Sequence, residues 1–327
     1  MNNRSFAPFS QNEAKVSTLT RDVLVAMVPT AAFACVLFGM RVIAVCGVTL
    51  LCALLFEAIG CAIARRPLSL GDGSAAVTGL IIALLMPASV PLFVPIIACA
   101  FAIFVVKLPF GGSGHNLFNP AAAGVAFVTE CFSHHVFAYP ARGSVLPFSI
   151  FTPEVHTAAS PAGLLKTGGS TAFSPEDLLI GQVTGAIGTV AILVLVAGAV
   201  YLFVRRGAAP LLTLSFLATC ALLAALFPRG ADITRAQSVL FELCSGYLVF
   251  GAVFMLNDPV TSPRHPLAHA FYGVLVGALT MLMRHIGAFE ESFCFALLLC
   301  NPFCNMLDRA AWRLLRPRRQ RRKEREV

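Results

Sequence analysis

Long apolar runs separated by short polar segments fill most of this chain. A helix needs roughly 17–25 apolar residues to cross a bilayer, and ten runs come close to that length. The third, fourth and fifth of them are short or interrupted by proline and glycine. The runs lie at about 23–40, 42–63, 74–90, 91–106, 120–137, 181–204, 209–227, 237–256, 268–284 and 289–308. The pattern predicts an all-α polytopic membrane protein with about ten transmembrane helices.

A polar segment divides the runs into two halves of five. We therefore expect a first transmembrane half at 1–137, an extracytoplasmic loop at 138–180, a second half at 181–308 and a basic tail at 309–327. An odd number of spans in each half would relate the halves as an inverted repeat, with a site near their interface. The loop is rich in Pro, Ser, Thr and Gly, and a long loop in a compact protein is usually functional.

The composition agrees with a membrane protein and argues against nucleic-acid binding. Hydrophobic residues make up 57% of the chain and charged residues 12%, whereas a soluble domain carries about 25% charged residues. The net charge is +8, and the excess lies in the run RLLRPRRQRRKER at 313–325. A basic run beside an apolar helix is typical of a cytoplasmic anchor that faces anionic lipid.

The distribution of basic residues also predicts the orientation. With both termini inside, the inner connections contain the arginine pairs Arg65–Arg66 and Arg205–Arg206 together with the basic tail. The outer connections contain only scattered basic residues. The positive-inside rule therefore favours cytoplasmic termini and places the loop at 138–180 outside.

A glycine-rich run at 111–121 follows the fourth span. Its glycines let the backbone approach a ligand or a helix closely, and its asparagines could cap a helix that starts at Pro120. Such a helix N-terminus suits an anionic or electron-rich ring, although a re-entrant turn that only closes the bundle explains the run equally. The candidate binding residues are Gly111, Gly112, Gly114, Asn116 and Asn119.

A second polar run, Asn257–Pro263, follows the eighth span on the same expected face of the membrane. Taken alone, this run is typical of a proline-rich connector between two helices. Together with the glycine-rich run it becomes a candidate second wall of one site, with Asp258 and Thr261 as binding residues.

Three carboxylates lie within apolar runs: Glu57, Glu130 and Glu242. An isolated charge there costs several kcal/mol, so each should be paired, protonated or turned to a cavity. They are candidates for an ion pathway, and purely structural hydrogen bonds are the alternative. We expect no metal site and no catalytic side chain in the chain itself.

The glycine-rich run, which reads GGSGHNLFNPAAAGVAF, resembles the GG-x-G-x-N-x-FNPA signature of the RnfD/NqrB family. These are membrane flavoprotein subunits of the Rnf complex and of the sodium-pumping NADH:quinone reductase. The start SFAPFSQNEAKVSTLTRDVLVAMVPT and the segments 72–80, 256–263 and 284–308 are also similar to the family. The resemblance covers most of the chain, and the length suits the RnfD branch.

The resemblance implies covalent FMN, joined by a phosphoester to a threonine of an outside loop in the motif D-G-x-[ST]-x-A-T. The matching stretch here begins at Glu154, and Ser160 takes the place of the acceptor threonine. Thr157 and Ala159 match the motif, whereas Glu154 and Val155 depart from it. A serine hydroxyl can form the same phosphoester. The alternative is an unmodified Ser-Pro turn.

The family further implies a second, non-covalent flavin (riboflavin) at the two polar runs, and electron transfer between the flavins coupled to Na⁺ or H⁺ translocation. It implies as partners a flavin transferase and the other Rnf-type subunits, namely the membrane subunits A and E, the FMN-carrying RnfG and the soluble subunits B and C. The chain has no glycine-rich βα nucleotide motif, so NADH oxidation belongs to a different subunit. A non-redox transporter and a flavin-less scaffold are the competing interpretations.

Overall fold

The computed structural model describes residues 13–66, 70–112, 114–168, 174–229 and 233–315. Residues 5–12 of the family-like start and the part of the basic tail beyond residue 315 lie outside this range. The described residues are helical, without a β-strand, and contain an isolated antiparallel bridge between Pro140 and Thr157. The all-α class that the apolar runs predicted is therefore confirmed.

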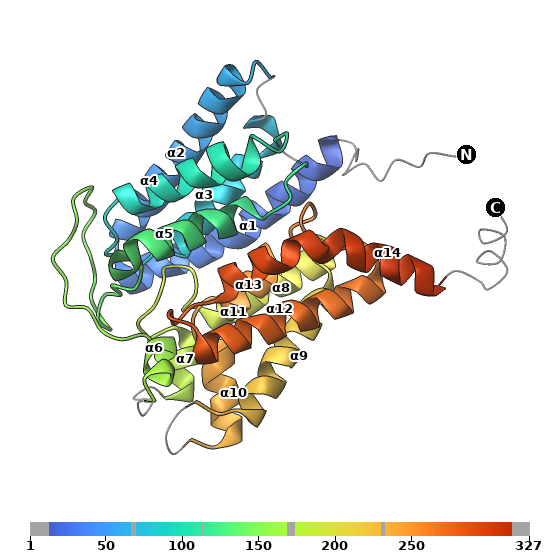
Figure 1. The fold of residues 1–327 in the computed structure, drawn as a ribbon. Coiled ribbons are helices and arrows are strands. Elements are labelled where there is room, and N and C mark those ends of the chain that lie inside the picture. The colour runs from blue at the N-terminus through green and yellow to red at the C-terminus, as the bar shows by residue number, and fades with distance from the viewer. Residues whose placement is uncertain (1–12, 67–69, 113, 169–173, 230–232, 316–327) are drawn as a thin grey trace, which may run out of the picture.

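The first half of the chain forms one group of helices (Figure 1). Its last helix, α5, starts where the sequence predicted, because Asn119 caps it and Pro120 stands at its first position. The elements are α1 (Glu13–Phe38), α2 (Arg41–Ile63), η1 (Leu70–Asp72), α3 (Ser74–Leu84), α4 (Phe93–Ala100), which continues as the π-helix η2 (Phe101–Lys107), and α5 (Pro120–Val136).

The second half packs beside the first (Figure 1). Between them lie a long loop and two short helices, α6 (Pro161–Lys166) and α7 (Pro175–Ile180). The second half contains α8 (Ile192–Val204), α9 (Pro210–Leu226), α10 (Arg235–Cys244), α11 (Leu248–Phe250), the π-helix η3 (Gly251–Met255), α12 (Pro266–Ile286), α13 (Phe293–Cys300), η4 (Asn301–Phe303) and α14 (Cys304–Leu315).

Two sides of this bundle can be distinguished in Figure 1. The side where α1 begins and α14 ends is called the terminal side, and the opposite side, which carries α6 and α7, is called the loop side.

Few of the apolar runs form one uninterrupted helix. Three described helices are long and apolar enough to cross a membrane, namely Ser17–Phe38, Arg41–Ile63 and Pro266–Ile286. A fourth span is formed if the pair Arg235–Cys244 and Leu248–Met255, bent by 62°, counts as one. The structure thus does not confirm the number ten, because several runs are helical over only part of their length.

The non-helical breaks within these apolar runs form hydrogen bonds with one another inside the protein. The backbone N–H groups of Ile187 and Gly188 donate to the carbonyl oxygens of Met86 (2.9 Å) and Leu84 (2.6 Å). The hydroxyl of Tyr247 donates to the carbonyl of Leu85 at 2.7 Å. Non-helical backbone within a membrane protein is tolerated only where such partners or water satisfy its polar groups. The three breaks therefore join the two halves.

Close packing of α4 on α5 depends on Gly124. A Cβ atom at this position would lie 2.5 Å from the carbonyl oxygen of Ala98, and helices in membranes approach closely where small residues face each other. We expect Gly124→Leu to lower the free energy of unfolding by about 1–3 kcal/mol, as overpacked cores do. Thermal unfolding in detergent measures it, with Gly47→Leu as control, because space is open at Gly47. Equal melting temperatures for the two variants would contradict this packing.

Candidate functional sites

Ser160 lies on the loop side, where it caps α6. Its Oγ accepts a hydrogen bond from the backbone N–H of Gly163 at 3.0 Å and donates one to Glu290 Oε1 at 3.0 Å. The residue is only 4% exposed. The hydroxyl that the sequence singled out is thus buried and paired with a carboxylate 130 residues away.

The loop before Ser160 is fixed by backbone contacts. Ala141 N–H donates to the carbonyl of His156 at 2.9 Å, and Ala158 N–H donates to that of Tyr139 at 3.1 Å. These contacts leave Thr157 exposed while Ser160 is buried. The two residues of the expected acceptor motif therefore differ in environment.

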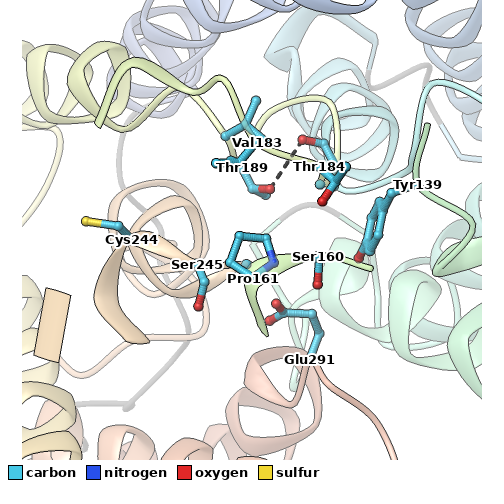
Figure 2. A pocket seen from close by; sticks show the side chains of 13 residues that line it. Tyr139, Ser160, Pro161, Val183, Thr184, Thr189, Cys244, Ser245 and Glu291 are labelled. Atoms are coloured by element: carbon cyan, nitrogen blue, oxygen red, sulfur yellow. Dashed lines mark hydrogen bonds between the residues drawn. The ribbon is translucent and has the colours of Figure 1, made fainter. Parts of the chain in front are cut away.

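A small pocket of about 270 Å³ adjoins Ser160. Figure 2 shows Ser160 between the ring of Tyr139 and the carboxylate of Glu291. The non-helical segment at 183–190 and residues 244–246 complete the lining.

A network of buried charges extends from this pocket into the second half. Arg284 donates to Glu242 Oε2 at 2.9 Å and to Glu291 Oε2 at 3.0 Å. Arg229 Nε donates to Glu242 Oε1 at 2.5 Å. Glu242, a candidate for an ion pathway, is thus held between two arginines. Glu290 and Glu291 were not predicted as site residues, although an adjacent acidic pair six and seven residues after an arginine was visible in the sequence.

The carboxylates beside Ser160 have unusual proton affinities. Burial, aided by the charge of Glu291, raises the pKa of Glu290 to about 7, against the opposing effect of the hydrogen bonds from Ser160 and Tyr139. Burial also raises the pKa of Glu291, and Arg284 opposes it. The pKa of Lys166 is lowered by burial, and its ammonium donates to the carbonyls of Gly287 and Ala288. Glu290 therefore titrates near neutral pH.

The second site is a cleft on the terminal side, between the two halves. It encloses about 880 Å³, including space open to solvent. Its polar lining comes from Thr20, Ser74, Thr78, Lys107, Asn116, Asn119, Asn257 and Asp258.

The structure brings the two polar runs together in this cleft. Asn119 Oδ1 accepts from Ala122 N–H at 3.1 Å, which makes Asn119 the cap of α5. Asn301 links the runs, because its Oδ1 accepts from Asn119 N–H at 3.0 Å and its amide nitrogen donates to the Thr261 carbonyl at 3.3 Å. The Thr261 hydroxyl donates to Asp258 Oδ2 at 2.9 Å. Thr261 thus positions Asp258 instead of lining the cleft.

The remaining members of the glycine-rich run differ in position. Gly114 and Asn116 line the cleft, and Asn116 Oδ1 is buried without a hydrogen-bond partner. Gly111 and Gly112 stand outside the lining, with positive φ angles of 119° and 85°. Their role is to turn the chain from η2 toward α5.

The other two intramembrane carboxylates occupy unrelated places. Glu57 Oε2 lies 2.9 Å from Lys107 Nζ, and each side chain is 1% exposed. Lys107 Nζ also donates to Ser74 Oγ at 2.7 Å. Glu130 is exposed on α5. The three carboxylates considered for an ion pathway therefore do not form one cluster.

These features define a polytopic α-helical membrane protein with a polar site on each side of its bundle. The chain belongs to the NQR2, RnfD, RnfE family, whose model matches residues 3–314. This match confirms the resemblance to the RnfD/NqrB family that the sequence motifs indicated.

Several relatives are similar to the chain over nearly their whole length. The D subunit of the Na⁺-translocating ferredoxin:NAD⁺ oxidoreductase complex of Acetobacterium woodii is 28% identical over 308 residues, covering 93% of this chain and 92% of the relative. The D subunit of an ion-translocating oxidoreductase complex of Halorhodospira halophila is 30% identical over 338 residues (95% and 93%). The D subunit of the proton-translocating ferredoxin:NAD⁺ oxidoreductase complex of Clostridium ljungdahlii is 28% identical over 315 residues (93% and 93%).

Proposed function

We propose that this chain is the D subunit of an Rnf-type ion-translocating ferredoxin:NAD⁺ oxidoreductase complex, and that it transfers electrons between FMN on Ser160 and a second flavin in the terminal-side cleft. The observation that carries the proposal is the pair of polar sites on opposite sides of one bundle. Full-length similarity to three relatives named as D subunits supports it. The partners would be subunits A, E, G, B and C, with the NAD⁺/NADH reaction on one of these.

Ser160 offers suitable chemistry for a phosphoester but little room. A nucleophilic hydroxyl beside a carboxylate is the usual arrangement for forming a covalent bond, and Glu290 Oε1 lies 3.0 Å from Ser160 Oγ. The adjoining pocket of about 270 Å³ is smaller than the roughly 300–1,000 Å³ of ligand sites. Attachment at Ser160 would therefore displace the contact with Glu290 and place the ring outside the closed pocket.

The terminal-side cleft offers polar groups to a flavin and more space than the pocket beside Ser160. It holds about 880 Å³ of space, part of it open to solvent, against about 270 Å³ in the pocket beside Ser160. When bound, a flavin supplies reversible electron transfer. The chain's own contribution would be to orient the ring with Asn116 and Asn119 and to exclude water with Val253 and Phe254, which also line the cleft.

The proposal includes the topology. We place the terminal side in the cytoplasm and the loop side in the periplasm of a bacterial inner membrane, because the basic residues favour that orientation. Ten crossings result if the short and broken helices each count as a crossing, and the two halves would then be inverted repeats. The relatives are named for both Na⁺ and H⁺, so either ion fits.

The test measures the flavin that is covalently bound to the chain and the flavin that can be extracted from it. We expect the chain co-expressed with its flavin transferase to give a fluorescent band in a denaturing gel, and Ser160→Ala to lose it. Thr157→Ala, which removes the exposed hydroxyl of the same motif, is the control and should stay fluorescent. Acid should release a second flavin from all three proteins. A dark wild-type band would disprove the covalent FMN, and the absence of extractable flavin would disprove the second. If both results were obtained, the remaining interpretations of the chain would be a flavin-less scaffold or a non-redox transporter.

A further inference from the structure

Lys107 brings a positive charge to the wall of the terminal-side cleft. It ends the π-helix η2 and lines the cleft even though its side chain is only 1% exposed. Among the described residues that line the cleft, it is the single basic one, and Asp258 is the single acidic one. A buried ammonium is costly unless it is paired, so the partners of Lys107 matter.

Two contacts, one of them from the cleft lining, hold this ammonium in place. Glu57 Oε2 lies at 2.9 Å and Ser74 Oγ at 2.7 Å from Lys107 Nζ, and Glu57 itself does not line the cleft. An ammonium donates up to three hydrogen bonds. The two contacts therefore leave capacity for one further acceptor, and the ammonium borders the cleft.

A complementary acceptor lies in the same cleft. Asn116 Oδ1 is buried there and has no hydrogen-bond partner. Leaving such an atom unsatisfied costs about 1–3 kcal/mol. A ligand with a donor for Asn116 beside an acceptor for Lys107 would satisfy both, and the carbonyl–N–H–carbonyl edge of a flavin ring has this pattern.

We infer that Lys107 is the positioning residue of the terminal-side cleft: it binds the electron-rich edge of a planar ring with an imide group and favours the form of that ring that has gained negative charge. The inference rests on the proposed second flavin. Glu57 then acts as the partner that keeps the ammonium buried and charged, which gives this intramembrane carboxylate a role without placing it in the cleft.

The acidic residue opposite does not cancel this charge. Burial raises the pKa of Asp258, while the hydrogen bonds from Val260 and Thr261 and the charge of Lys107 oppose that effect. Asp258 already accepts from Val260 N–H at 3.1 Å and from the Thr261 hydroxyl at 2.9 Å. Its carboxylate is thus held by its own loop, and Lys107 remains available to the ligand.

The experiment uses the full complex with Ser160→Ala in this chain, so that the second flavin would be the one left on the chain. The flavin is removed, and riboflavin is titrated back under oxidising and under reducing conditions. We expect the double variant Glu57→Gln/Lys107→Gln to bind reduced riboflavin at least tenfold more weakly, with a smaller loss for oxidised riboflavin. This variant removes both charges together, so that no buried charge is left unpaired.

A second variant separates the ligand from the fold. Exchanging the charges, Glu57→Lys with Lys107→Glu, keeps an ion pair but turns a carboxylate toward the cleft. We expect this exchange variant to melt at the same temperature as the parent. Its loss of riboflavin affinity should be at least as large as that of Glu57→Gln/Lys107→Gln. Glu176→Gln, at an exposed site on α7 of the loop side, is the control and should bind riboflavin as the parent does.

The outcomes distinguish the inference from the proposed function. If the parent and both pair variants bind riboflavin with the same ratio of reduced to oxidised affinity, the role of Lys107 is wrong and the second flavin stands. If the parent itself binds no riboflavin, the second flavin is wrong and the inference fails with it.

Discussion

Replacing Arg284 by methionine is expected to abolish the folded chain. Arg284 is fully buried, at 0% exposure, and its guanidinium bonds both Glu242 and Glu291. Removing one partner of a buried ion pair costs about 3–5 kcal/mol, because a charge is left without compensation. Here Glu291 loses its arginine and Glu242 keeps Arg229 alone, and a protein is stable by only about 5–15 kcal/mol. The yield of monodisperse protein in size-exclusion chromatography measures the effect.

An exposed ion pair on the loop side supplies the control. Arg142 bonds Asp177 at 2.6 Å, with 46% of its side chain exposed, and such pairs contribute about 0–1 kcal/mol. Arg142→Gln should therefore yield protein like the wild type. The double variant Arg284→Met/Glu291→Gln should recover part of the lost yield, because it neutralises the carboxylate that loses its arginine. Normal yield of Arg284→Met alone would show that this network is not buried.

Stability should fall as the pH rises toward neutrality, and Glu290→Gln should remove much of that fall. Glu290 has a pKa of about 7 in the folded chain, against an ordinary value of 4.5. Between these values the folded state binds more protons than the unfolded state, so the carboxyl destabilises the fold progressively as the pH increases. The full difference, present above pH ~7, corresponds to roughly 3 kcal/mol.

Melting temperatures between pH 5 and pH 8 test this prediction. The groups that act on Glu290 are Glu291, Arg284, Ser160 and Tyr139, and Lys166 interacts with it as well. All of them are unchanged in Glu290→Gln, whose amide oxygen can still accept from Ser160. The variant should therefore be the more stable protein at pH 8. The exposed control Glu154→Gln should follow the wild type, and parallel profiles for Glu290→Gln and wild type would contradict the raised pKa.

Local patterns in the sequence predicted much of this molecule. The apolar runs indicated the helical class, and the Asn-Pro pair at Asn119 indicated the start of α5. The two polar runs were expected to form one site, and they line one cleft together. These features depend on neighbouring residues, and a helix cap or an apolar face is visible in a single stretch of chain.

Features that depend on distant residues could not be predicted in this way. Tyr247 satisfies the break after α3 from 162 residues away, and Glu290 reaches Ser160 across 130 residues. Lys107 directly follows an apolar run in the sequence, and nothing in that stretch shows that it is buried against Glu57. An apolar run does not reveal where its helix stops either, because the partners that stabilise a break come from other parts of the fold.

The central claim, that this chain carries a flavin on Ser160, is tested most directly by peptide mass mapping of the protein co-expressed with its flavin transferase. We expect a mass gain of one FMN phosphoester on the peptide that contains Ser160, absent from Ser160→Ala. The same peptide at its unmodified mass in the assembled wild-type complex, or a flavin located on Thr157, would contradict it.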